Sequence, residues 1–450
     1  MAPAKKFVML VMVFTLVNAP INAYSTEKDF VHCESTVKKW AASSLDAEVK
    51  EDRHTLRDLL FFLHIPRTGG RTYFHCFLKK MYTSYLECPR SYDKLRFDPS
   101  QPNCRLMVTH DDYSMVSKLP QERTSVVTIL RNPVDRVFST YEFSVEVAAR
   151  FLVHPNLTSA TQMTKRIRSK NKEVSTLDIW PWKYLVPWMR EDLFSRRDAR
   201  KRGDFNSIRE SNDSYDMEDV VMPLREFIND PVARDIIHNG ATLQVAGLTN
   251  NSYFSESHEV RHCVRKYQAL GEYVLEVAKK RLDNMLYVGL TEDHRESATM
   301  FANVVGLQVI SQLQALSSSM EQADKNTSDM NSSFQNYQPD SNYLLATDIS
   351  VTENVGTSNE NARLQVPEVV LQQIMSLNNL DVELYNYAQG IFAQQRKRLM
   401  SKLVEAERQL ITLSSSYAIH FWKVLSLVLL LLVLLVLLVN ARRRTLKVKV

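Results

Sequence analysis

The sequence predicts an α/β fold with three layers, in which helices cover both faces of a mainly parallel sheet. Four short, nearly continuous apolar runs are typical of strands buried on both faces: residues 59–65, 104–109, 125–130 and 285–290. Segments with helical spacing alternate with them, at residues 72–82, 134–151, 260–281 and 294–304. This alternation favours a parallel sheet, and the ligands of such sheets bind beyond the carboxyl ends of the strands.

The composition is that of a globular protein, and it indicates neither a nucleic-acid site nor a zinc site. The 450 residues are 44% hydrophobic and 24% charged, which allows a sizeable core. A net charge of +5 suits an anionic ligand or an acidic substrate, but does not indicate nucleic-acid binding. The five cysteines lack the spacing of a zinc site, so no metal is expected. One or two disulfides with a leftover thiol are expected, and Cys88 and Cys104 form a candidate pair that closes a short loop.

The N-terminal end has the layout of a secretory signal peptide. Lys5 and Lys6 precede an apolar run, and small residues lead to a plausible cleavage site after Ala23. Residues 1–23 are therefore expected to be removed, and residues 24–56 to form a lumenal N-terminal segment.

The C-terminal end predicts one transmembrane helix over residues 418–440. Residues 424–439 are all Val or Leu except Ser426, and the helix is long enough for a hydrocarbon layer of about 30 Å. Basic residues in the tail 441–450, starting at Arg442, mark the cytosolic side. Together the two ends predict a single-pass type I membrane protein with a lumenal body.

The lumenal body divides into three parts. Residues 57–310 carry the alternating strands and helices, residues 311–361 are polar and are expected to form a flexible glycosylated insertion, and residues 362–413 predict an amphipathic helix or helix pair. The chain contains five Asn-X-Ser/Thr sequons, which agree with a lumenal body: Asn156, Asn212, Asn250, Asn326 and Asn331.

The segment after the first strand is a candidate anion site. It reads His64-Ile-Pro-Arg-Thr-Gly-Gly70 and continues through Arg71 and Thr72 into a helix. Glycines at a strand-to-helix turn let backbone amides approach an anion, and the helix dipole favours negative charge. Arg67 and Arg71 add charged donors, and Thr68 and Thr72 add hydroxyls. The spacing is not that of a Walker A motif.

A second anion element follows the strand at residues 125–130. Arg131 stands at the strand end, Asn132 and Pro133 begin the next helix, and Ser139 lies two turns along that helix. Arg131 and Ser139 can therefore converge on one phosphate, for which the arginine fork is well suited.

The two motifs together resemble those of sulfotransferases that use 3′-phosphoadenosine 5′-phosphosulfate (PAPS). Residues 64–70 resemble the 5′-phosphosulfate loop, and residues 130–136 resemble the 3′-phosphate motif. The chain is similar to the heparan sulfate 6-O-sulfotransferase-like family, also at residues 287–292 and 377–385. The resemblance implies a P-loop-like sulfotransferase fold, PAPS as co-substrate, and donor binding by these residues: Arg67, Thr68, Gly69, Gly70, Arg71, Thr72, Arg131 and Ser139.

The topology favours one branch of that family. A cleaved signal and a C-terminal span are typical of the plant tyrosylprotein sulfotransferases, so the resemblance implies transfer of sulfuryl to tyrosine in secreted peptide precursors, in the Golgi membrane. The expected partners carry acidic residues near the tyrosine. A glycan O-sulfotransferase, or an inactive type I lumenal binding protein, are the alternatives.

Three residues are candidates for catalysis. Arg67 is expected to bind the sulfuryl or bridging oxygens, although relatives usually have Lys there, and an arginine cannot donate a proton as a lysine does. His110, at a strand end, is the candidate base, because an imidazole pKa of about 6.5 suits proton removal; a polar anchor at the strand end is the alternative role. His64 is the other contender, more plausible as a group that orients the loop.

The acceptor side is less defined by the sequence. A basic cluster could receive acidic residues of a substrate but is equally a solvated loop: Arg196, Arg197, Arg200, Lys201 and Arg202. Three tryptophans could line an acceptor cleft or pack in the core: Trp180, Trp182 and Trp188.

Overall fold

The computed structural model describes residues 27–47, 54–88, 104–153, 202, 222–324 and 366–447, with the side chains of residues 121, 150–153, 232, 319–324, 410–420, 433–434 and 437–447 left out. Several predicted features lie outside the described residues: the signal peptide at residues 1–23, the three tryptophans, the basic cluster except Arg202, and four sequons, Asn156, Asn212, Asn326 and Asn331.

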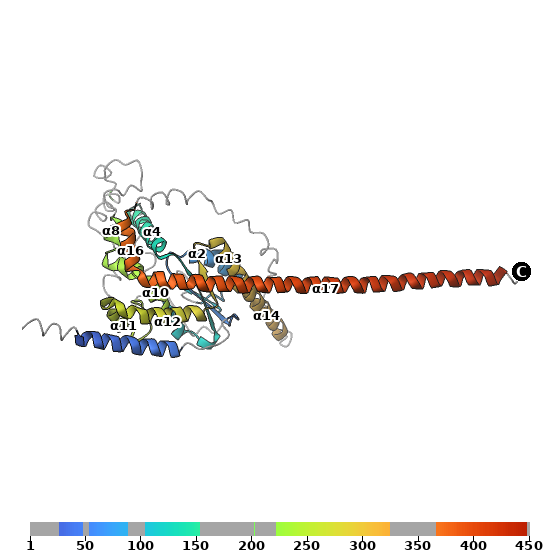
Figure 1. Cartoon of the computed structure of the whole chain (residues 1–450), viewed down its shortest axis with the longest axis horizontal. Coiled ribbons are helices and arrows are strands. Elements are labelled where there is room, and N and C mark those ends of the chain that lie inside the picture. The colour runs from blue at the N-terminus through green and yellow to red at the C-terminus, as the bar shows by residue number, and fades with distance from the viewer. Residues whose placement is uncertain are drawn as a thin grey trace, which may run out of the picture. The chain divides into compact units, whose positions relative to one another are not determined.

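A four-stranded parallel sheet forms the centre of the protein (Figure 1). Its strands are β1 (Leu59–Leu63), β2 (Leu106–Thr109), β3 (Thr124–Leu130) and β4 (Tyr287–Leu290), in the order β2-β1-β3-β4. Phe61 of β1 aligns with Met107 of β2 and Val126 of β3. Every residue of the four strands is buried, so both faces of the sheet are covered. The predicted α/β class and all four predicted strands are confirmed.

Each strand leads at its carboxyl end into a loop and a helix. β1 is followed by α2 (Gly70–Tyr73), which continues as the π turn η1 (Phe74–Leu78) and α3 (Lys79–Met81). β2 is followed by the 3-10 helices η2 (Tyr113–Lys118) and η3 (Gln121–Arg123), β3 by α4 (Pro133–Val153), and β4 by α13 (His294–Phe301). Because the strands are parallel, these loops share one edge of the sheet.

Five helices connect α4 to β4 within the described residues: α8 (Leu224–Phe227), α9 (Pro231–Ile237), α10 (Gly240–Val245), α11 (Ser257–Lys266) and α12 (Gly271–Asn284). The single helix predicted over residues 260–281 is wrong, because the backbone is extended at Tyr267 and η6 (Gln268–Leu270) separates α11 from α12. Gly271 begins α12 where a Cβ atom would lie 2.9 Å from Leu380 Cδ1, so a side chain at this position would crowd Leu380.

The helical segment that begins with α13 extends further along the chain than the polar composition of residues 311–361 predicts. It continues through η7 (Ala302–Gly306) into α14 (Leu307–Asp324), so residues 311–324 are helical and do not belong to a flexible insertion; residues 325–365 are outside the described residues. The amides of Gln308 and Gln312 donate to the carbonyl oxygens of His54 and Arg57 at 3.1 and 3.0 Å. These contacts attach α14 to the chain that enters β1.

Two disulfides stabilise the fold. Cys88–Cys104 confirms the predicted pair. Cys33–Cys263, not predicted, ties a helix over residues 27–46 to α11, and Cys76 is the exposed free thiol of the described residues.

The C-terminal part comprises α16 (Glu368–Leu377) and α17 (Asn379–Lys447). The chain divides into two compact units, of which the first ends at Phe392 and the second spans Ala393–Val450. The first residues of α17 therefore belong to the unit that contains the sheet. Among the residues that the structure describes, no helix combines the length and the apolarity needed to cross a membrane.

Candidate active site

The predicted site residues meet at the carboxyl edge of the sheet. His64 follows β1, His110 follows β2, Arg131 follows β3 and Thr291 follows β4. The sequence prediction that the motifs gather at this edge is confirmed by the strand order and by the contacts between the loops.

The loop from His64 to Gly70 is held by contacts within the protein. Arg67 and Gly69 adopt left-handed backbone conformations, with φ angles of 68° and 76°. The Thr68 hydroxyl donates to Ile65 O at 2.9 Å, and Thr291 Oγ1 lies 2.7 Å from Thr68 O. The buried Thr68 side chain therefore helps to hold the loop, and its predicted role in donor binding stays a prediction.

Gly70 permits a close approach between the loop and a histidine. A Cβ atom on Gly70 would lie 2.5 Å from His64 Cδ2 and 2.9 Å from Phe62 Cζ, distances too short for any side chain there. Gly70 also starts α2, whose next residues, Arg71 and Thr72, are exposed. The first turn of this helix thus presents backbone amides and a guanidinium at the site.

Arg67 connects the two predicted anion motifs. Its Nε and Nη2 atoms donate to Ser139 Oγ at 3.1 and 2.9 Å, and its guanidinium lies over the Phe143 ring, 4.5 Å from the centroid. Arg131 Nη1 approaches Arg67 O at 3.3 Å. Arg67, Arg131 and Ser139 are therefore in direct contact, so the two predicted anion motifs adjoin each other.

His64 and His110 form a buried pair. Their ring centroids are 4.2 Å apart, and both side chains are almost fully buried. His110 Nδ1 lies 2.9 Å from His64 O, and a carbonyl oxygen can only accept, so Nδ1 carries the proton and Nε2 the lone pair. Burial, with a smaller contribution from the charges of Arg71 and Arg67, lowers the pKa of His110 to about 3. Burial, followed by the charges of His110, Arg67 and Arg71, also holds the pKa of His64 well below its usual range.

Gln244 forms hydrogen bonds to the loops that carry His64 and His110, although the sequence analysis did not identify it. This buried side chain belongs to α10, and its Nε2 lies within hydrogen-bonding distance of three carbonyl oxygens, those of His64 (3.3 Å), His110 (2.9 Å) and Asp111 (3.0 Å). His64 O thus accepts from both Gln244 and the His110 ring. The contacts cross more than 100 residues of chain, which is why no local pattern could reveal them.

The acidic residues after His110 are structural. Asp111 accepts from the Thr109 hydroxyl at 3.0 Å. Asp112 caps η2 by accepting from Ser114 N at 3.0 Å, and it accepts from both the backbone and the hydroxyl of Thr249 at 2.9 and 2.7 Å. Both carboxylates are buried and hold the segment that carries His110.

The two remaining family motifs are joined to the donor motif by hydrogen bonds. Asn132 N donates to Glu292 Oε1 at 2.8 Å, and Tyr385 Oη donates to Glu292 Oε2 at 2.7 Å. Arg136 forms a buried ion pair of 2.9 Å with Asp381, which also accepts from Thr242 N at 2.7 Å. Residues 287–292 and 377–385 therefore support the segment that carries Arg131.

Comparisons with known proteins agree with this geometry. A family described as "Sulfotransferase domain" matches residues 39–189. A protein of Arabidopsis thaliana named "Protein-tyrosine sulfotransferase" is 53% identical over 489 aligned residues, covering 97% of this chain and 97% of the relative.

The chain belongs to the protein-tyrosine sulfotransferase family. PAPS is the sulfate donor of sulfotransferases, and the residues of this site fit such an anion. Arg67, Arg71 and Arg131 supply positive charge beside a glycine-bearing turn at a helix start. Within the described ranges, no group of three or more His, Cys, Asp and Glu side chains could hold a metal ion.

Proposed function

We propose that this sulfotransferase transfers the sulfuryl group of PAPS to tyrosine residues of secreted peptide and protein precursors, giving tyrosine O-sulfate and adenosine 3′,5′-bisphosphate. The observation that carries the proposal is the 53% identity, over nearly the whole chain, to a protein-tyrosine sulfotransferase. The contact between Arg67 and the Arg131–Ser139 pair supports it.

The arginines supply charge stabilisation at the donor. When bound, PAPS supplies an activated sulfuryl group whose phosphate side gains negative charge as the group leaves. Transfers of this kind depend on position and on charges arranged in advance. Arg67 is assigned to the sulfuryl and 5′-phosphate oxygens, with Gly69, Gly70 and Arg71 beside it, and Arg131 and Ser139 to the 3′-phosphate. Arg67 keeps the positive charge of a lysine but does not act as an acid, so it stabilises charge without giving up a proton.

His110 is assigned to remove the acceptor proton. Its neutral ring presents Nε2 as a lone pair, because Nδ1 donates to His64 O. A tyrosine phenol has a pKa of about 10, far below that of a sugar hydroxyl, so it tolerates a weaker base than a sugar hydroxyl does. His64 packs against His110 and orients the loop rather than taking the proton.

We also propose that the enzyme is a type I glycoprotein of the Golgi membrane with its catalytic unit in the lumen. The signal-like residues 1–23, the apolar run 424–439 and the two disulfides support this location. Asn250 is the sequon asparagine within the described residues, and it is exposed. Its side-chain Nδ2 donates to Asp235, and its Oδ1 accepts from Arg261. Protease protection and glycosidase digestion of sealed microsomes test this topology, and cleavage of the catalytic unit in intact vesicles would contradict it.

A single assay distinguishes the proposed acceptor from the alternatives. The purified protein is incubated with radiolabelled PAPS, an Asp-Tyr-containing peptide and a desulfated glycan. Label on peptide tyrosine supports the proposal, and a peptide with Asn in place of Asp should then be a poorer acceptor. Label on the glycan would favour a glycan O-sulfotransferase, and no label on either would favour an inactive lumenal protein.

Two substitutions test the assigned roles in the same assay. Arg131→Ala should abolish detectable PAPS binding, because Arg131 is assigned to the 3′-phosphate; intact binding would contradict this. His110→Ala should lower kcat by about 10² or more while PAPS still binds, the range for loss of a general base. Full turnover by His110→Ala would place the base elsewhere.

A further inference from the structure

Helix α17 carries an apolar stripe in the unit that begins at Ala393. Apolar residues recur there at alternating intervals of four and three: Leu399, Leu403, Ala406, Leu410, Leu413 and Tyr417. This spacing of 3.5 residues is that of the a and d positions of a coiled coil, with Leu403, Leu410 and Tyr417 at a. Leu403 is 48% exposed and the adjoining Met400 and Val404 are exposed as well.

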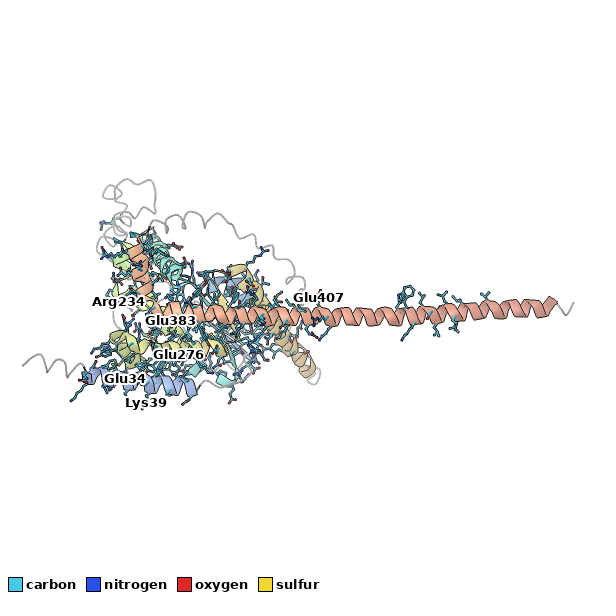
Figure 2. All side chains as sticks on the ribbon, in the orientation of Figure 1. Glu34, Lys39, Arg234, Glu276, Glu383 and Glu407 are labelled. Atoms are coloured by element: carbon cyan, nitrogen blue, oxygen red, sulfur yellow. A yellow bond between two sulfur atoms is a disulfide. The ribbon has the colours of Figure 1, made fainter. Side chains whose placement is uncertain are left out.

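Opposite charges flank this stripe in the arrangement of a parallel pair of helices. Lys402 occupies a g position, and Glu407 occupies the e position of the following heptad. Five residues apart in the sequence, the two side chains do not face each other on one helix. Glu407 is labelled on α17 in Figure 2. In a parallel dimer, a g residue of one helix lies beside the e residue of the next heptad of its partner.

From this pattern we infer that residues 399–417 of α17 form a parallel coiled coil with the same segment of a second copy of this chain. Lys402 of each copy then pairs with the partner's Glu407, so the dimer has two equivalent ion pairs around a closed two-fold axis. An antiparallel pair would bring g to g and e to e, so Lys402 would not face the partner's Glu407. The charge pattern therefore selects a second copy in the same orientation.

The continuity of the helix supports the same orientation. α17 is unbroken to Lys447, and the a and d spacing continues into the apolar run at Val424, Leu427 and Leu431. Residues 399–417 alone span about 28 Å at 1.5 Å per residue, a short coiled coil. In the membrane topology proposed above, two chains that leave the membrane in the same direction would be held parallel, which offsets part of the entropy of association.

The inference is independent of the acceptor that the enzyme sulfates. It is tested with cysteine cross-linking of the full-length chain in membrane vesicles, in a Cys76→Ser background that removes the exposed thiol. Leu403→Cys, at an a position, should form a disulfide-linked dimer on mild oxidation. Arg408→Cys, at the outward f position, is the matched control and should remain mostly monomeric. Equal cross-linking at the two positions, or none at Leu403→Cys, would overturn the proposal.

Charge exchange adds a test of orientation. Lys402→Glu and Glu407→Lys should each reduce cross-linking through Leu403→Cys, because each places like charges together. The double variant should restore it, because the ion pairs reform with reversed polarity. Peptide sulfation should be unchanged in all three, which shows that the catalytic unit is folded. Failure of the double variant to restore the dimer contradicts the parallel pairing.

Discussion

The two halves of the candidate site differ in how their polar groups are held. On the side of β3, the Arg67 guanidinium is only partly buried and bonds to Ser139, a neighbour supplied by the next motif. On the side of β2, His64 and His110 are fully enclosed and are fixed by Gln244, a residue from a distant helix. The half of the site with Arg67 therefore has permanent positive charges that are partly exposed to an anion. The histidine half keeps two titratable rings neutral.

This difference separates two requirements of sulfuryl transfer. A charged donor needs cations that never lose their protons, and arginine supplies them at any physiological pH. Burial keeps the His110 ring neutral by lowering its pKa to about 3, which also makes the ring a weaker base than a free imidazole. Substitutions in the first half should therefore weaken donor use, whereas those in the second should alter turnover and pH dependence.

The largest effect is expected at Arg67. Arg67→Gly should lower kcat/KM for PAPS by about 10³-fold, because it removes a preorganised charge from the transferring group. Glycine is chosen because the φ angle of 68° would strain alanine. Arg67→Lys should recover part of the loss, and Arg225→Ala, an exposed arginine on α8, serves as the control. Steady-state kinetics measure these changes; an unchanged kcat/KM in Arg67→Gly would remove Arg67 from the donor site.

A smaller effect is expected at Gln244, a positioning residue. Gln244→Met keeps the volume but leaves three buried carbonyl oxygens without this donor. We expect kcat to fall about tenfold with little change in the KM for PAPS, since a lost buried partner costs about 1–3 kcal/mol. Gln372→Met, on the exposed face of α16, is the control.

A pH readout distinguishes positioning by Gln244 from a general loss of stability. In Gln244→Glu a carboxylate would face the three carbonyl oxygens, and only its protonated form can donate to them. The kcat of Gln244→Glu relative to the native enzyme should therefore rise as the pH falls from 7 to 5. A ratio independent of pH would contradict the positioning role.

The smallest effect concerns stability against acid. The unfolded chain binds a proton at His110 below pH about 6.5, whereas the folded protein does not until about pH 3. Between these values the unfolded state binds more protons, so the free energy of unfolding decreases as the pH falls, by about 1 kcal/mol per pH unit for this histidine. His110→Asn should reduce that slope by this amount in denaturant titrations between pH 6 and 4, and His258→Asn, on the surface of α11, should not. An unchanged slope in His110→Asn would mean that His110 is charged in the folded state.

Local patterns sufficed to predict part of the molecule. The four strands are short apolar runs buried on both faces, and the donor motifs follow two of them directly, so composition and adjacency located Arg67, Arg131 and His110 at one edge. The Cys88–Cys104 disulfide closes a loop between residues 16 apart in sequence and was predicted for the same reason.

The features that escaped prediction depend on contacts between distant segments. Gln244 is an ordinary helix residue in the sequence, and the motif at residues 377–385 gave Asp381 no role; the roles of both arise from packing against the histidine loops and α4. The close approach of Leu380 to Gly271 and the bonds from α14 to the chain before β1 also join segments far apart in the sequence. Cys33 and Cys263 are 230 residues apart, so no spacing could pair them.

The Arg136–Asp381 pair also fixes where this protein can be shortened. Asp381 forms a buried ion pair with Arg136 of α4. In the sequence it follows the polar residues 311–361, far from the last strand. A truncated form ending before α17 would leave the Arg136 guanidinium buried without its counter-charge, a loss of about 3–5 kcal/mol. A form ending after Phe392 retains the pair. The minimal catalytic fragment therefore extends far past the last strand, to the start of the final helix.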